Sequence, residues 1–116
     1  MNDLILETIE SYNNYLTLLP DGCLNIAEKL REDQIANALN DIKDFTEGVI
    51  WLVDAGTQLS KNEVEVTLNI SQIHDFLNEI NESLQMNDYN LAADLFEYEI
   101  AEFFKTATLL QSALKQ

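Results

Sequence analysis

The sequence has few cysteines, histidines, prolines and glycines, and these shortages exclude whole classes of structure. Its 116 residues include one Cys, one His, one Pro and three Gly. A single cysteine excludes both an internal disulfide framework and a zinc site built from several thiolates. So few glycines and prolines leave little material for turns, which indicates few and long elements of secondary structure.

Long apolar runs are also missing. No run approaches the roughly 18 residues of a membrane-spanning helix, and the N-terminal residues lack the basic-then-apolar layout of a signal peptide. We therefore expect a soluble, cytoplasmic protein that does not associate with membranes.

Positive charge is scarce, because six Lys and Arg stand against 21 Asp and Glu, for a formal net charge of −15. Phosphate contacts need clustered cations, so neither nucleic acid nor an anionic membrane is an expected partner. Apolar residues nevertheless make up 47% of the chain, which is enough to build a core despite the charge. The length suits one domain over residues 1–116.

Apolar residues recur in alternating steps of three and four along four stretches of the chain. This heptad spacing is typical of helices packed at shallow angles. No stretch keeps a period of two for long, so strands are not expected. Because short connections make neighbouring helices antiparallel, we predict an all-α, up-down-up-down four-helix bundle with helices over 3–31, 34–59, 62–86 and 89–114.

Short polar side chains mark the predicted helix starts, where they can accept hydrogen bonds from unpaired amides. Ser60-Lys61-Asn62-Glu63 fits a capping box for the third helix. Asp33 is the expected N-cap of the second helix, and Asn87 or Asp88 that of the fourth.

Pro20 is the ambiguous point of the first helix, because an internal proline removes one backbone hydrogen bond and usually kinks or breaks the helix. The apolar spacing keeps its phase from Leu16 to Cys23 across Pro20-Asp21-Gly22. A loop would reset that phase. We predict one helix kinked near Pro20, the alternative being two helices broken there.

The stretch 88–100, with the sequence DYNLAADLFEYEI, resembles a signature of small helical-bundle proteins of unknown function from Gram-positive bacteria. The chain departs from that pattern at Ala101-Glu102, where the family would have a proline nearby. The resemblance implies a helical bundle and a bacterial source, and it implies no biochemical activity.

Groupings that carry chemistry are missing from the sequence. His74 has Ser71 three residues before it, so the Glu-x-x-His pairs of di-iron bundles are absent. Cys23 falls on the apolar spacing of the first helix, where a small buried residue fits. No glycine-rich phosphate loop or nucleophile motif occurs. We therefore expect no catalytic, cofactor-binding or metal-binding residues, and no enzyme activity.

Glu99 is the one charged residue on the four apolar spacings, and it is a candidate buried polar residue. Burying a carboxylate without partners is costly, so Glu99 would set helix register or form part of a site. The alternative is a small rotation of the helix that places Ile100 in the core and Glu99 at its edge.

Several apolar residues point away from the main spacings and are candidates for binding a partner. Trp51 lies about 150° from the centre of its helix's apolar face, so it is either an exposed anchor or covered by a neighbouring helix. A second stripe on the fourth helix is either buried or forms an exposed patch. A weak internal repeat aligns Phe104 with Trp51. The candidate partner-binding residues are Trp51, Leu91, Leu95, Tyr98 and Phe104.

The expected function is that of a non-enzymatic interaction protein, an adaptor, chaperone or regulator that binds a protein partner through a helical face. A homodimer is a further possibility for the same face. The alternative is an acidic inhibitor, of the immunity-protein or nucleic-acid-mimic kind, that blocks a basic partner through its charge.

Overall fold

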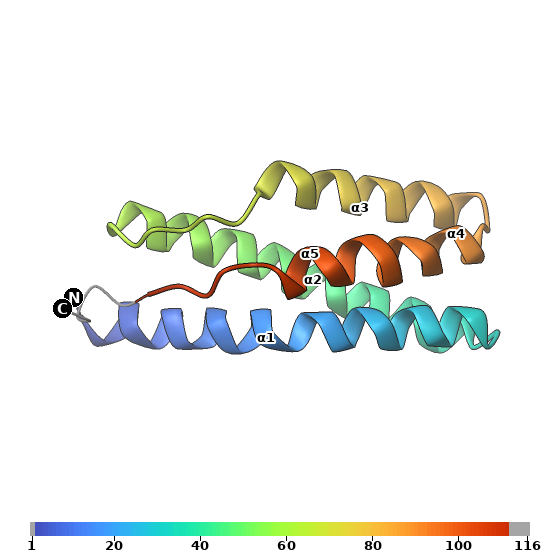
Figure 1. Ribbon diagram of the computed structural model, residues 1–116, viewed down its shortest axis with the longest axis horizontal. Coiled ribbons are helices and arrows are strands. Elements are labelled where there is room, and N and C mark those ends of the chain that lie inside the picture. The colour runs from blue at the N-terminus through green and yellow to red at the C-terminus, as the bar shows by residue number, and fades with distance from the viewer. Residues whose placement is uncertain (1, 112–116) are drawn as a thin grey trace.

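The computed structural model describes residues 2–111 and contains four helices, with no strand among these residues (Figure 1). This confirms the predicted all-α class. None of the described helices is long and apolar enough to cross a membrane. The fourth helix is continuous but has three segments, the middle one π-helical. The elements are α1 (Asp3–Arg31), α2 (Ile35–Lys61), α3 (Ile70–Gln85), α4 (Tyr89–Asp94), η1 (Leu95–Ile100) and α5 (Ala101–Lys105).

The helices run side by side in alternating directions and form a rod of 49 × 21 × 21 Å (Figure 1). α1 lies along the whole length and is in close contact with α2 and with every segment of the fourth helix. α3 packs on α4 and η1. The core is apolar, as the heptad spacing requires, and its rings meet edge to face where Phe45 of α2 contacts Phe96 and Phe104.

α1 passes through Pro20 as one α-helix, so the alternative of two broken helices is wrong. The predicted spacing is buried on both sides of the proline, including Leu16 and Cys23. The helix begins at a cap that the sequence analysis did not identify, since the side chain of Asn2 accepts a hydrogen bond from the Ile5 amide.

The predicted capping box at Ser60 is wrong, because α2 continues through Ser60 to Lys61. Glu63 then takes a left-handed conformation with φ 66°, and α3 begins only at Ile70. Its cap is Asn69, whose side chain accepts from the Gln72 amide at 3.0 Å.

The segment 62–69, predicted to be helical, is instead a turn at 62–63 followed by non-helical backbone over 64–69. Val64 is buried, and Val66 and Leu68 pack against the core while the residues between them are exposed. The run VEVTLN alternates apolar and polar residues and is rich in β-branched side chains, which favours extended backbone. The expectation that no stretch keeps a period of two overlooked this short run.

The predicted N-cap of the fourth helix is confirmed at Asp88, and the predicted N-cap of the second helix at Asp33 is wrong. Asp88 caps the fourth helix, since its carboxylate accepts from the Leu91 amide at 3.0 Å. Asp33 does not cap α2, because it has φ 62° and the cap position falls on Gln34, which makes no side-chain capping bond.

Glu99 is exposed and Ile100 is fully buried, so the prediction of a buried Glu99 is wrong and only the placement of the two residues in its alternative is correct. The cause is the π-helical segment η1 rather than a rotation of the whole helix. A π-turn holds one more residue than an α-turn. The buried face that begins with Ala92 and Phe96 therefore continues at Ile100 and Phe104, one residue later than the heptad spacing predicts.

The fourth helix ends at Lys105, earlier than the predicted residue 114, and the chain continues without regular secondary structure to residue 111. The predicted residues 112–114 lie outside the described residues. Asn13 of α1 holds this segment by two hydrogen bonds to Leu110. Its Nδ2 donates to the Leu110 carbonyl at 3.0 Å, and its Oδ1 accepts from the Leu110 amide at 2.8 Å.

Removal of this pair of hydrogen bonds should destabilise the protein. Asn13→Ala should be less stable than Asn14→Ala by about 1–2 kcal/mol, because both changes alter helix propensity equally and only Asn13 binds Leu110. Chemical denaturation measures the difference, and amide exchange at Leu110 should accelerate only in Asn13→Ala. Equal stability of the two variants would show that the contact contributes nothing.

Candidate functional site

A groove of about 390 Å³ runs between α1 and α2 and is the main candidate for a binding site. Its α1 wall consists of residues three or four apart, from Tyr15 to Lys29, and its α2 wall includes Asp44. Side chains with this spacing share one face of a helix, so the groove follows the two helices for several turns.

The floor of the groove is apolar and its middle is open. Leu19, Ile26 and Phe45 line it with side chains that are buried in the core, and the exposed Leu18 stands at its edge. Gly22 also lines the groove, and a Cβ built on it would meet nothing within 4 Å. The missing side chain therefore leaves room against the backbone of α1.

Tyr15 lines one end of the groove, and Trp51 packs against Tyr15 without lining the groove itself. Trp51 is 42% exposed and packs edge to face against Tyr15, with ring centroids 6.1 Å apart. The Tyr15 ring lies directly over Gly48 of α2, where any Cβ would collide with its hydroxyl end. Trp51 is therefore neither fully exposed nor fully covered by a neighbouring helix, because one part of the indole packs on Tyr15 and the rest faces solvent.

Charged groups form the other end. Lys29 and Asp41 make an ion pair across the two helices. Asp44 forms no ion pair with any residue between 2 and 111. Burial, then the nearby Cys23 thiol and the Asp44 carboxylate, raise the pKa of the Tyr15 hydroxyl. The groove therefore combines an apolar floor with an unpaired negative charge.

None of the five candidate partner-binding residues lines this groove, and only Trp51 lies beside it, through its contact with Tyr15. Leu95 and Phe104 are each 3% exposed and cannot contact a partner of the folded protein, which corrects their assignment. They are buried because the fourth helix packs against both α1 and α3. Leu91 and Tyr98 are exposed at 43% and 65%, on α4 and η1.

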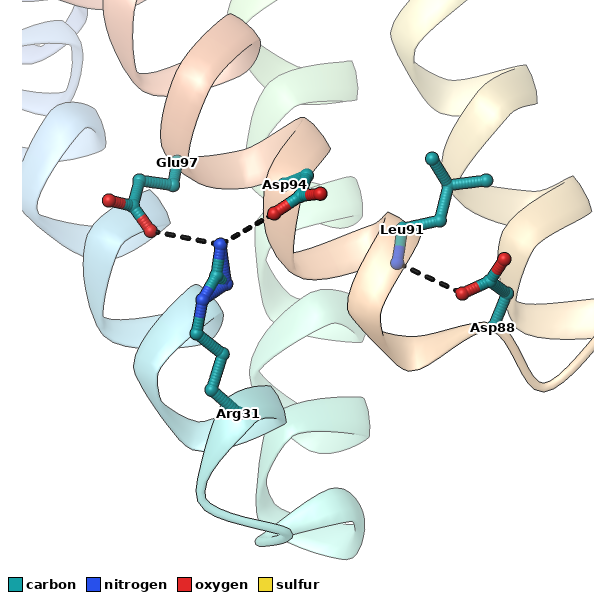
Figure 2. A network of polar contacts seen from close by, with 5 residues as sticks. All are labelled: Arg31, Asp88, Leu91, Asp94 and Glu97. Atoms are coloured by element: carbon teal, nitrogen blue, oxygen red, sulfur yellow. Dashed lines mark hydrogen bonds and ion pairs between the residues drawn. The ribbon is translucent and has the colours of Figure 1, made fainter.

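Three of the four acidic residues of the stretch 88–100 have structural partners (Figure 2). Arg31, at the end of α1, reaches Asp94 at 2.7 Å and Glu97 at 3.1 Å, and Asp88 caps α4. These contacts fix the fourth helix to α1 near the start of η1. The recognisable part of the sequence therefore builds the fold and does not line the groove.

The cysteine and the histidine of the chain do not form a catalytic or metal-binding group among residues 2–111. Cys23 is fully buried, and burial raises the pKa of its thiol from 9.0 to about 12. His74 is exposed on α3. Among residues 2–111, no three His, Cys, Asp or Glu side chains are grouped so that they could hold a metal ion.

The sequence analysis missed Tyr15, Gly22 and Asp44. Two signals were available. A glycine inside a helix usually has a packing reason, and both Gly22 and Gly48 are internal to helices. Tyr15, Leu18, Gly22, Asn25 and Lys29 also form a second stripe on the first helix, beside the heptad spacing.

Comparison with known proteins identifies one family. The family model DUF8042, a domain of unknown function, matches residues 7–108, so the chain belongs to this family. No curated protein and no solved structure matches the chain.

Alanine at Gly22 should stabilise the protein, whereas alanine at Gly48 should bring little or no net gain. Gly22→Ala should stabilise the protein by about 1 kcal/mol, because helix propensity improves and the new methyl group meets open space. Gly48→Ala displaces the Tyr15 ring and disrupts its contact with Trp51, which offsets the same gain by about 1 kcal/mol. Thermal denaturation and Trp51 emission measure both effects. Equal stabilisation with unchanged emission would contradict the close packing of Tyr15 on Gly48.

The buried thiol of Cys23 and the buried hydroxyl of Tyr12 should make the protein less stable at alkaline pH. Cys23 stays neutral in the native state to about pH 12, whereas its unfolded-state thiol ionises above about pH 9. Ionisation then favours the unfolded state, so stability falls from pH 9 to pH 12, by up to about 4 kcal/mol from this group. Tyr12, with its pKa raised by burial from 10.0 to about 12, adds to the loss.

Cys23→Ala isolates the contribution of the thiol. The free energy of unfolding, measured in urea between pH 7 and pH 11, should fall less steeply in the variant than in the natural protein. Parallel curves would mean that the thiol ionises equally easily in both states.

Proposed function

We propose that this member of the DUF8042 family is a non-enzymatic protein-interaction module, an adaptor, chaperone or regulator, that binds a protein partner through the α1–α2 face. The observation that carries the proposal is the exposed Trp51 packed on Tyr15, which lines one end of an open apolar groove. Trp and Tyr are the residues most enriched among those that dominate binding energy at interfaces.

The state of Trp51 suits an anchor. Its contact with Tyr15 holds the indole in place before a partner arrives, so little side-chain entropy is lost on binding. Its exposed part, together with exposed Leu18, offers apolar area that a partner would remove from water. Deep burial of Trp51 would have left this face without an anchor.

A second candidate function, the acidic inhibitor, is favoured by a separate surface on α3 and η1. Burial, followed by the carboxylates of Glu99, Asp75 and Glu82, raises the pKa of Glu79. Four acids are therefore near enough to repel one another. Such a surface attracts a basic partner through long-range charge, and its binding would weaken steeply as salt rises.

The cellular setting belongs to the proposal as well. The resemblance of the stretch 88–100 supports a Gram-positive bacterial source, and a buried, unpaired Cys23 suits the reducing cytoplasm.

The test compares two residues of matched exposure. Trp51→Ala should reduce binding of the native partner by about tenfold or more, as loss of an interface anchor does. Leu91→Ala, with 43% exposure on α4, should leave it unchanged. Tagged variants are compared by quantitative mass spectrometry after capture from the native cell, with melting temperatures as the check on folding.

Partner loss in Leu91→Ala alone would contradict the α1–α2 face and assign binding to the fourth helix. Binding that is insensitive to both changes but lost in Glu79→Gln, and weakened by salt, would replace the interaction module by the acidic inhibitor.

A further inference from the structure

We propose that the occupant of the α1–α2 groove is a cationic amphipathic helix of the partner protein. The proposal rests on the interaction function given above and names the chemistry of the partner.

The dimensions of the groove fit a helix. Its α1 wall extends from Tyr15 to Lys29, a rise of about 21 Å at 1.5 Å per residue. A partner helix of about 14 residues, lying along the groove, would match this length and present an apolar residue to it every three or four positions.

The apolar floor gives such a helix a place to seat its side chains. Leu19, Ile26 and Phe45 provide the surface, and the open space at Gly22 lets one partner side chain approach the α1 backbone closely. Tyr15 lies at one end of the groove and carries Trp51 beside it, so the exposed indole would meet the start of the partner's apolar stripe.

The charges select a cationic partner. Lys29 is the one cation that lines the groove, and Asp41 already pairs with it. Asp44 lines the groove and is paired with no described residue, and Asp21 is exposed beside Gly22. Basic residues flanking the partner's apolar stripe would compensate these carboxylates, whereas acidic residues would meet like charge.

The same charges argue against a second copy of the chain as the occupant. Two copies would bring together formal net charges of −15 each, and close approach of like charges is unfavourable. The groove walls carry no cation that could offset this repulsion, since Lys29 is paired.

Three synthetic 14-residue peptides test the proposal by titration against the whole protein, followed by Trp51 emission and calorimetry. The first carries Leu on one helical face and Lys on its flanks. The second replaces every Lys by Glu. The third has the first peptide's composition in scrambled order, so it has the same charge without one apolar face.

Matched variants locate the binding. Gly22→Leu fills the open part of the groove, and Asn78→Leu adds the same side chain to an exposed position on α3. Asp44→Asn removes the unpaired groove carboxylate, and Asp75→Asn removes the same charge from α3. The Asp44 comparison keeps the test valid even if Gly22→Leu folds poorly.

The Leu/Lys peptide should bind the natural protein and Asn78→Leu equally, and Gly22→Leu at least about tenfold more weakly. Asp44→Asn should weaken binding about threefold relative to Asp75→Asn, as expected for an exposed ion pair. The Glu and scrambled peptides should bind at least about tenfold more weakly than the Leu/Lys peptide.

Equal binding of the scrambled or the Glu peptide, or undiminished binding to Gly22→Leu, would overturn the proposal. So would a dimer of the natural protein that Gly22→Leu dissociates, since the groove would then hold a second copy. Trp51-dependent capture of a native partner that the Leu/Lys peptide does not displace would overturn this inference while leaving the proposed function intact.

Discussion

The structure depends on α1 remaining a single helix through Pro20. Proline at an interior position removes one backbone hydrogen bond, and the disruption costs about 3 kcal/mol or more. The apolar stripe of α1 offsets this cost, because it is buried both before and after Pro20, against α2 and all segments of the fourth helix. The groove has the same requirement, since Tyr15 precedes the proline and Gly22 follows it. A break at Pro20 would therefore separate the aromatic end of the groove from its open middle and its charged end.

The fourth helix satisfies two demands that a regular α-helix could not satisfy together. An uninterrupted heptad would have placed the carboxylate of Glu99 in the core, and an isolated buried charge costs several kcal/mol. The π-turn of η1 moves the phase by one residue, so that Ile100 is buried and Glu99 reaches water. Arg31 holds the start of this segment through Asp94 and Glu97, which fixes where the phase changes (Figure 2).

Features set by periodicity could be predicted from the sequence, and features set by tertiary contacts could not. The all-α class, the extent of α1 and the cap at Asp88 follow from apolar spacing and local hydrogen bonding. The non-helical segment at 64–69 has a local signal in the alternation of VEVTLN, which the heptad spacing obscured. The non-helical segment at 107–111 could not be predicted in this way, because it is held by the distant Asn13. The same holds for the candidate site. Trp51 could be singled out by its angle on the helix, but the Tyr15 ring beneath it and the groove beside it arise only from the pairing of α1 with α2.

The chain uses its glycines in an unusual way. All three lie inside α1 and α2, where they clear space beside tyrosine rings or within the groove, and none has a positive φ. The left-handed positions fall instead on Asp33, Glu63 and Asn87, one in each connection between successive helices. Glycine would adopt that conformation more easily, most of all in place of Glu63. Substitution by glycine at these connections could therefore raise stability without altering the α1–α2 groove.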